Sequence, residues 1–188
     1  MSVWALLTNR HACRIPEDGI SGRVKDELIK GEVVVSPAAK PNHRIIAKRL
    51  MVLLDKIVDQ AKFEVSFDNS FVVEPTDPAY MPRPDVFVMD RTRFRAAAAE
   101  DRYPEGSPEL SIEVVSPSNT KKKLAEKIEL YLANGSLAVW VVYPKKRKVV
   151  LWEGGGKDTE FREGDALPLP SAPSNRTIQV SEIFSVLP

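Results

Sequence analysis

Apolar residues recur along two stretches of the chain at the spacing of a helix. The stretch 42–61 predicts an amphipathic helix with Asn42 as its N-cap. The stretch 120–133 predicts a second helix, which Asn119 or Thr120 would open and Asn134-Gly135 would close. The apolar positions are Ile45, Ile46, Leu50, Leu53, Leu54, Ile57 and Val58 in the first helix, and Leu124, Ile128 and Leu132 in the second.

Shorter apolar runs predict strands. The segment 23–36 alternates and indicates a hairpin that turns near Lys30-Gly31, and 63–67 and 70–73 indicate two short strands joined by Asp68-Asn69. Further strands are expected to begin at Asp85 and to cover 110–115, 137–143, 148–152 and 177–180. A short helix and a surface loop are expected over 94–108, a last helix over 181–186, and loops over 75–84, 154–156 and 168–173.

The order of these elements predicts the fold class. The run 110–115 alternates too little to be half exposed, so we expect it at the centre of the sheet. With the helix 120–133 and the strand 137–143 it forms a strand-helix-strand unit, whose strands pair in parallel with a right-handed crossover. The fold is therefore α/β with a mixed sheet. We expect one domain over 1–188, with an N-terminal extension over 1–21 and a C-terminal extension over 153–188.

Composition and charge narrow the classes of protein. The 188 residues are 43% hydrophobic and 28% charged, which suits a packed core. A net charge of +1 gives no global positive field, so any binding of nucleic acid must depend on a local patch. Cys13 is the only cysteine, which excludes an intrachain disulfide and a cysteine-rich zinc site. No apolar run has membrane-spanning length and 3–7 lacks the features of a secretory signal, so we expect a soluble cytoplasmic protein.

Two carboxylates in strand-like segments are the main candidates for chemistry. Glu113 stands at the centre of Ser-Ile-Glu-Val-Val, where packing does not explain a charge; the alternative is an edge strand with Glu113 in water. Asp85 follows two prolines and, taken alone, could simply start a strand or end a turn. Together the two could share a magnesium ion, with the carbonyl of Val114 as a third oxygen ligand.

The second helix carries a polar stripe beside its apolar line. Lys123, Lys127 and Tyr131 are spaced at i, i+4 and i+8. Lys127 borders the apolar line, so it either points toward Glu113 or belongs to a solvated basic face. For Lys121 and Lys122 the solvated face is the favoured interpretation. If Lys127 points inward, it could orient an attacking water or stabilise developing negative charge.

At these residues the chain resembles the Uma-type restriction endonuclease family, part of the PD-(D/E)XK nuclease superfamily. The similar pieces, which cover about 22–152, are Glu27-Leu28-Ile29-Lys30-Gly31-Glu32, His43, Pro84-Asp85-Val86, Glu113-Val114-Val115-Ser116-Pro117-Ser118, Lys127 with Tyr131, and Gly135 with Val139-Trp140-Val141-Val142. The resemblance implies a restriction-endonuclease-like core, a central mixed β-sheet flanked by helices, and a homodimer. It implies catalytic roles for Asp85, Glu113 and Lys127, with Asp85 and Glu113 as the metal ligands.

The chain departs from the family's pattern at three places. The superfamily's lysine normally stands two residues after the glutamate, where this chain has Val115, so Lys127 must act from the helix. Lys123 stands where the family commonly has an aspartate, and Tyr143-Pro144 stands where it often has Asp-Pro. Lys123 and Tyr131 are accessory candidates, as are two residues with open alternatives. Glu27 could be an outer ligand, although an exposed hairpin position is slightly favoured; His43 could contact the site or DNA, or only cap or pack.

Three functions are compatible with these residues. The first is an endonuclease that uses magnesium, or manganese in its place, to hydrolyse DNA phosphodiester bonds. The second is a catalytically inactive nuclease-fold module for nucleic-acid binding or assembly, whose basic segments Lys121–Lys123 and 145–148 bind phosphates. The third is an enzyme acting on another phosphorylated substrate. A divalent metal bound between Asp85 and Glu113 would separate the first from the second.

Overall fold

The computed structural model describes residues 25–36, 39–73, 80–117, 119–170 and 176–188. A six-stranded mixed sheet in the order β3-β4-β5-β6-β7-β8 forms its centre, and only β5 and β6 run parallel. The elements are β1 Lys25–Ile29, β2 Glu32–Ser36, α2 Pro41–Ile57, β3 Phe63–Phe67, β4 Val86–Asp90, α3 Arg91–Ala99, β5 Leu110–Val114, α4 Lys121–Ala133, β6 Ala138–Tyr143, the 3-10 turn η1 Pro144–Lys146, β7 Lys148–Glu153, β8 Lys157–Arg162, β9 Ala166–Pro168, β10 Thr177–Gln179 and α5 Val180–Phe184. The α/β class and the mixed sheet flanked by helices are therefore confirmed.

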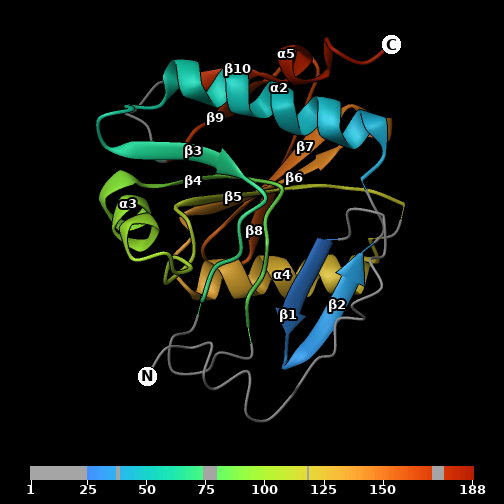
Figure 1. The fold of residues 1–188 in the computed structure, drawn as a ribbon. Coiled ribbons are helices and arrows are strands. Elements are labelled where there is room, and N and C mark those ends of the chain that lie inside the picture. Colours follow the sequence, from blue (N-terminus) through green and yellow to red (C-terminus); the bar gives the residue numbers. More distant parts are fainter. Residues whose placement is uncertain (1–24, 37–38, 74–79, 118, 171–175) are drawn as a thin grey trace.

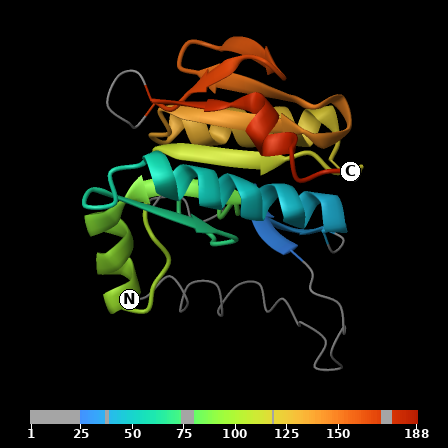
Figure 2. The same cartoon turned by 90° about the horizontal axis from the view of Figure 1, so that it is seen from above.

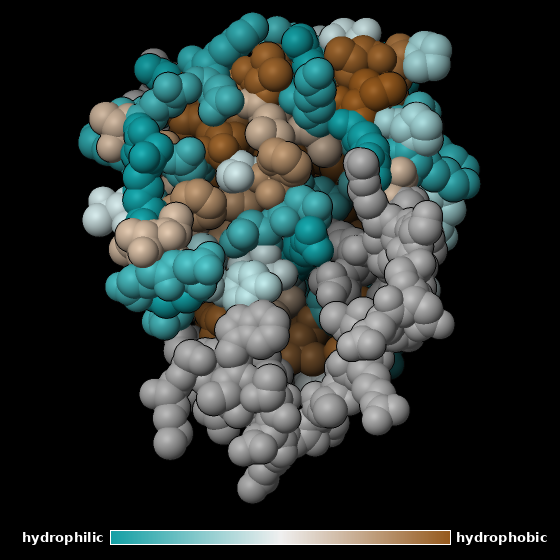
Figure 3. All heavy atoms as spheres, viewed as in Figure 1, coloured by the Kyte–Doolittle hydropathy of each residue, from teal (hydrophilic) through white to brown (hydrophobic). Residues whose placement is uncertain are grey.

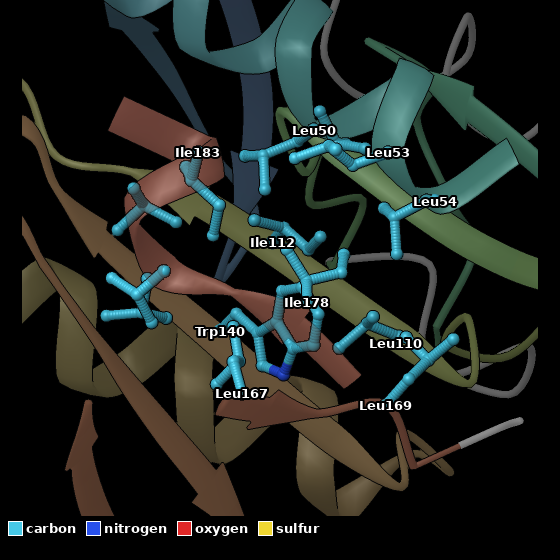
Figure 4. Packing of buried hydrophobic residues seen from close by; sticks show 14 of the residues in the cluster. Leu50, Leu53, Leu54, Leu110, Ile112, Trp140, Leu167, Leu169, Ile178 and Ile183 are labelled. Atoms are coloured by element: carbon cyan, nitrogen blue, oxygen red, sulfur yellow. The ribbon is translucent and has the colours of Figure 1, made fainter. Parts of the chain in front are cut away.

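Helices cover both faces of the sheet. α2 lies over one face and α4 over the other (Figures 1 and 2). Because strand side chains alternate, β5 directs Leu110, Ile112 and Val114 toward α2, where they join a core with Leu50 and Trp140. Figure 4 shows leucines of α2 converging on Ile112 and Trp140, with Ile178 and Ile183 beside them. Ser111 and Glu113 alternate to the face that α4 covers.

The second core lies under α4 and is smaller. Leu124, Ile128 and Tyr131 pack on Val139 and Val141 of β6. Residue Thr120 caps the helix as expected, because its hydroxyl accepts the backbone N–H of Lys123. The parallel pairing of β5 with β6 confirms the predicted strand-helix-strand unit.

The first helix begins and ends earlier than expected. Lys40, not Asn42, is its N-cap, because Pro41 takes the first helical position, where its fixed φ and missing N–H suit a helix start. Its last residue is Ile57, and the backbone is extended at Val58. Helix α3 begins at Arg91 rather than Phe94 because the Asp90 carboxylate accepts the Arg93 N–H as an N-cap.

The expected pairing of 63–67 with 70–73 is wrong. β3 pairs instead with β4, antiparallel, with Phe67 opposite Val86. Within the described residues, the 70–73 segment belongs to no strand of the sheets and forms an isolated parallel bridge between Val72 and Glu105. Phe71 instead packs its ring edge-on against Phe87, 4.8 Å between centroids, so burial on the α4 side of the sheet determines its place. The hairpin at 25–36 is confirmed, with Lys30 and Gly31 both at positive φ in its turn.

The segment 153–188, expected as a C-terminal extension, contributes to the sheet and to the main core. The glycines 154–156 are a tight turn between β7 and β8, and β8 is a strand that the sequence did not predict, because five of its six side chains are exposed and polar. Leu167, Ile178, Ile183 and Phe184 are buried in the core under α2. Residues 1–21, expected as an N-terminal extension, lie outside the described residues.

The surface of the molecule is mainly polar, with apolar residues between the polar ones. On the face shown in Figure 3, hydrophilic residues surround smaller apolar areas. None of the helices in the described ranges combines the length and the apolar character that crossing a bilayer requires.

We predict that Phe184→Ala destabilises the protein by about 3–5 kcal/mol, because it removes a fully buried ring from the core under α2. Urea unfolding followed by circular dichroism measures the change. Val186→Ala, two residues away and 38% exposed, is the matched control and should stay within about 0.5 kcal/mol. A loss below about 1 kcal/mol for Phe184→Ala would show that α5 is not part of the cooperative core.

Candidate active site

The antiparallel ladder of β4 and β5 positions Asp85 and Glu113 at the same end of the sheet. Val86 is paired with Ile112. Asp85 precedes Val86 and Glu113 follows Ile112, so both residues stand at the end of the ladder where β4 begins and β5 ends. The backbone supports this placement directly, because the Asp85 N–H donates to the carbonyl of Ile112 and Asp85 Oδ2 accepts the N–H of Val114, at 2.8 Å.

Glu113 is buried and held by two side chains from α4. Its residue is only 3% exposed. Glu113 Oε1 lies 2.5 Å from Lys127 Nζ and accepts a hydrogen bond of 2.9 Å from the Tyr131 hydroxyl. Lys127 and Tyr131 are one helical turn apart, so both reach the same carboxylate. The edge-strand alternative, with Glu113 in water, is therefore wrong.

Lys127 points inward and bridges two carboxylates. It is 8% exposed, and its Nζ also contacts Glu27 Oε1 at 2.8 Å. The ammonium lies 5.9 Å from the centre of the Tyr131 ring. A buried ammonium requires partners of opposite charge, and Glu27 and Glu113 supply them.

Glu27 is not the exposed hairpin residue that the sequence slightly favoured. It is 8% exposed, and its Oε1 also accepts the backbone N–H of Arg83 at 2.7 Å. The hairpin that carries it is attached twice more: Leu28 pairs with Met81, and Lys30 forms an ion pair with Glu126 of α4 at 3.1 Å. Alternation within the hairpin could not indicate this burial, because the packing partner is 100 residues away in the sequence.

His43 comes to the same end of the sheet from α2. Its Nε2 lies 3.0 Å from Asp85 Oδ2. Because that oxygen also accepts the Val114 N–H, the Asp85 carboxylate is oriented from two sides. Contact with the candidate site is thus the alternative that holds for His43.

The structure brings six of the seven candidate residues together. Lys127 joins Glu27 and Glu113, and Tyr131 donates to the same Glu113. Asp85 and His43 form a second pair, which the hydrogen bond from Val114 N–H to Asp85 joins to the strand that carries Glu113. Lys123, the seventh, has an exposed side chain one turn before Lys127 and makes no contact with the described members of this set. Lys121 and Lys122 are also exposed, as the solvated-face interpretation predicted. Sequence reasoning missed the backbone donors, the N–H groups of Arg83 and Val114, because no side-chain type marks them.

Burial and negative charge determine the state of Tyr131. Burial raises the pKa of its hydroxyl well above the usual 10.0, and the nearby charges of Glu113, Glu27 and Asp85 raise it further. The phenol therefore keeps its proton at neutral pH and acts as a hydrogen-bond donor to Glu113. It cannot serve as a base near pH 7.

A family model, Uma2, described as a putative restriction endonuclease, matches residues 14–181. The chain belongs to the Uma2 family. All seven candidate residues lie within the Uma2 match. The family predicted from the sequence is therefore confirmed. A search of curated proteins found no match.

A solved structure shares the fold of this Uma2 protein. It is that of a putative nuclease belonging to DUF820 from Anabaena variabilis ATCC 29413, with a TM-score of 0.72 and 19% sequence identity. The similarity covers 86% of this chain and 90% of the other. At this identity the likeness concerns the fold, and it supports the restriction-endonuclease-like core.

We predict that the Tyr131 phenol makes the protein sensitive to alkali. A pKa that is raised in the folded state means that the folded protein holds its proton longer than the unfolded chain. This contribution to stability is complete below pH 10 and is lost as pH rises above it. Tyr131→Phe should lower stability near neutral pH by about 1–3 kcal/mol, through the lost hydrogen bond, but should flatten the decline above pH 10.

Urea unfolding measured from pH 7 to pH 11 tests this expectation. Tyr103→Phe, at an exposed tyrosine, is the control and should follow the parent curve. Parallel pH curves for the parent and Tyr131→Phe would contradict the assignment of a raised pKa to Tyr131.

Proposed function

We propose that this Uma2 protein is a metal-dependent endonuclease that hydrolyses phosphodiester bonds of DNA. The observation that carries the proposal is the buried Glu113, held by Lys127 and Tyr131 at the sheet end where Asp85 also stands. Keeping a carboxylate and an ammonium out of water is costly unless they are paired. A set of such groups at one end of a sheet is more typical of a reaction site than of a core.

The oxygen atoms available at this sheet end suit magnesium better than metals whose ligands all come from protein side chains. Within the described residues, no group of three or more His, Cys, Asp or Glu side chains is arranged to hold a metal ion. Magnesium is commonly bound by one or two carboxylates, with water and substrate phosphate completing its shell. Asp85 and Glu113 would be its side-chain ligands and the Val114 carbonyl a third oxygen, with manganese as a substitute. Such an ion, when bound, supplies a water of lowered pKa and withdraws charge from a phosphate oxygen.

The remaining residues position and balance these two carboxylates. His43 and the Val114 N–H both contact Asp85 Oδ2 and so fix the orientation of the whole carboxylate, including its second oxygen. Tyr131 keeps the proton on its hydroxyl and thereby fixes Glu113. Lys127 Nζ holds positive charge beside Glu113, where it can stabilise negative charge that develops on phosphate oxygens during attack.

A non-catalytic module for nucleic-acid binding or assembly is the second candidate. The specific observation in its favour is that the ammonium of Lys127 already contacts both Glu113 and Glu27, so a metal ion would compete with it for Glu113. A magnesium and manganese titration of cleavage on varied forms of DNA separates the two functions. The expected homodimer stays a prediction under either function.

We predict that Glu113→Gln abolishes metal-dependent cleavage without lowering stability. The amide keeps the size of the side chain but removes the charge that binds a cation. The variant leaves Lys127 paired with Glu27 alone, a balanced pair, so the metal-free protein should be at least as stable as the parent. Cleavage assays at matched magnesium and thermal unfolding in EDTA measure the two effects. The control is Glu129→Gln, at an exposed position of α4. Parental cleavage by Glu113→Gln would count decisively against the site.

We predict that Lys127→Met lowers kcat more than it raises KM, because the lost ammonium acts mainly in the transition state. The change also removes the ammonium that the buried Glu27 and Glu113 share, so that the two carboxylates repel each other, which should cost about 3–5 kcal/mol of stability. The double variant Glu27→Gln/Lys127→Met relieves that repulsion and keeps the test valid if the single variant does not fold. Steady-state kinetics are compared with Lys123→Met, which should affect kcat less. Parental kcat in a folded Lys127 variant would favour the non-catalytic module.

A further inference from the structure

Three stretches of the chain are basic and contain no acidic residue. They are 40–48, 119–125 and 144–148, and they hold ten of the 27 lysines and arginines. A net charge of only +1 means that this concentration of charge is local and is balanced elsewhere on the molecule. The three stretches form the start of α2, the start of α4 and the turn between β6 and β7.

All three stretches lie at the sheet end that carries the candidate active site. α2 begins there because His43 contacts Asp85. α4 begins there because it follows the end of β5, from which Glu113 projects. η1 lies there because β6 runs parallel to β5 and the Val115 N–H bonds to Val142 near the end of β6. α2 covers one face of the sheet and α4 the other, so the basic stretches surround the site from both sides (Figure 1).

The helix dipoles of α2 and α4 disfavour the positively charged side chains at their N-terminal ends. The N-terminal end of a helix carries a partial positive charge, which favours acidic side chains in the first turn. Neither α2 nor α4 has an acidic residue in its first turn. Lys121, Lys122 and Lys123 occupy the first three positions of α4, the least favourable place for cations. Stability does not account for this arrangement, and violations of a local rule concentrate at functional sites.

The contacts divide these cations into two groups. Arg147 is paired with Glu163, and Lys148 is paired with Glu160 of β8. These two cations therefore have structural partners. The other eight have exposed side chains. Lys48 lies two turns into α2, and the remaining seven, Lys40, Arg44, Lys121–Lys123, Lys145 and Lys146, stand at the helix starts and in the turn. Within the described residues, none of the seven forms an ion pair. We call these seven the basic rim.

We propose that the basic rim binds the phosphate backbone of DNA and seats the duplex over the site of Asp85 and Glu113. This inference rests on the proposed function and assigns its substrate contacts to three elements. Exposed lysines contact phosphates without reading bases, so the rim gives affinity that depends on salt rather than on sequence. The charge of DNA also relieves the repulsion between the lysines of α4 and the helix that carries them.

Binding measured in EDTA separates this inference from catalysis. Fluorescence anisotropy of a labelled DNA duplex gives Kd for the full chain over a range of salt concentrations. The rim variant is Lys121→Gln/Lys122→Gln/Lys123→Gln, because glutamine is close to lysine in helix propensity. The control is Lys56→Gln/Lys62→Gln/Lys157→Gln, which removes the same charge at exposed positions of the opposite sheet end. A second rim variant, Lys145→Gln/Lys146→Gln, tests the η1 turn.

The rim variant is expected to weaken binding by on the order of tenfold or more, and to make the slope of log K against log salt shallower by about 2.7. Its thermal midpoint should hold or rise by about 2–4 °C, because the repulsion at the start of α4 is gone. The Lys145→Gln/Lys146→Gln variant should weaken binding to a lesser extent, and the control should bind like the parent.

Equal losses of DNA affinity in the rim and control variants would overturn the proposal, because they would indicate that binding responds only to net charge. A parent that cleaves DNA but shows no salt-dependent binding in EDTA would overturn the rim and leave the proposed function standing. A rim variant that keeps parental affinity and slope would overturn it as well. A parent that binds through the rim but cleaves no DNA under any metal would support the rim and reject the nuclease.

Discussion

The ammonium of Lys127 between the carboxylates of Glu27 and Glu113 is the interaction on which the arrangement of the site depends. It joins three elements that are distant in the sequence: the β1–β2 hairpin, the central strand β5 and helix α4. All three side chains are buried, so the charge on each is stabilised by the opposite charge of its partner rather than by water. The pairing therefore fixes where the hairpin docks, how α4 is rotated over the sheet and which way Glu113 points. Among these groups the carboxylates are in excess over the ammonium, because Asp85 stands at the same sheet end.

That excess explains how the surroundings are built. Tyr131 keeps its proton because three carboxylates and burial all oppose its ionisation. His43 contacts Asp85, and the backbone N–H groups of Arg83 and Val114 donate to Glu27 and to Asp85. A backbone N–H holds a carboxylate in position without cancelling its charge, so that the attraction for a cation is preserved. The lysines of the basic rim stand further out, exposed to solvent, where they attract an anion without pairing with the site.

Elements with a buried face could be predicted from the sequence, and elements without one could not. β5 and β6 are buried on both faces and mostly apolar, so their central place and their parallel pairing followed from the pattern. β8 is polar and mostly exposed, and apart from Phe161, which packs against the main core, it is held by the ladder to β7, which leaves no periodic signal. The same holds for the site. Glu113 was conspicuous because it interrupts an apolar strand, whereas Glu27 looked like any hairpin glutamate because its partner Lys127 comes from a distant helix. The strand 70–73 was misassigned because a turn signal at Asp68 indicates a reversal but does not determine which strand follows.

The exchange of a strand lysine for a helix lysine is consistent with the layers of this fold. Side chains at 113 and 115 alternate to the same face of the sheet, and α4 covers that face. Val115 packs against the cluster of Leu124 and Ile128, so an ammonium there would lie among apolar side chains. Lys127 enters the same space from α4 and reaches Glu113 Oε1. A helix residue has a further advantage, because Tyr131 one turn later contacts the same oxygen and restricts its movement. Lysine in the helix thus places a positive charge at Glu113, while valine in the strand keeps an apolar contact with α4. The hypothesis that Lys127 takes the part of a strand lysine therefore requires only that the charge reach Glu113, whichever element carries it.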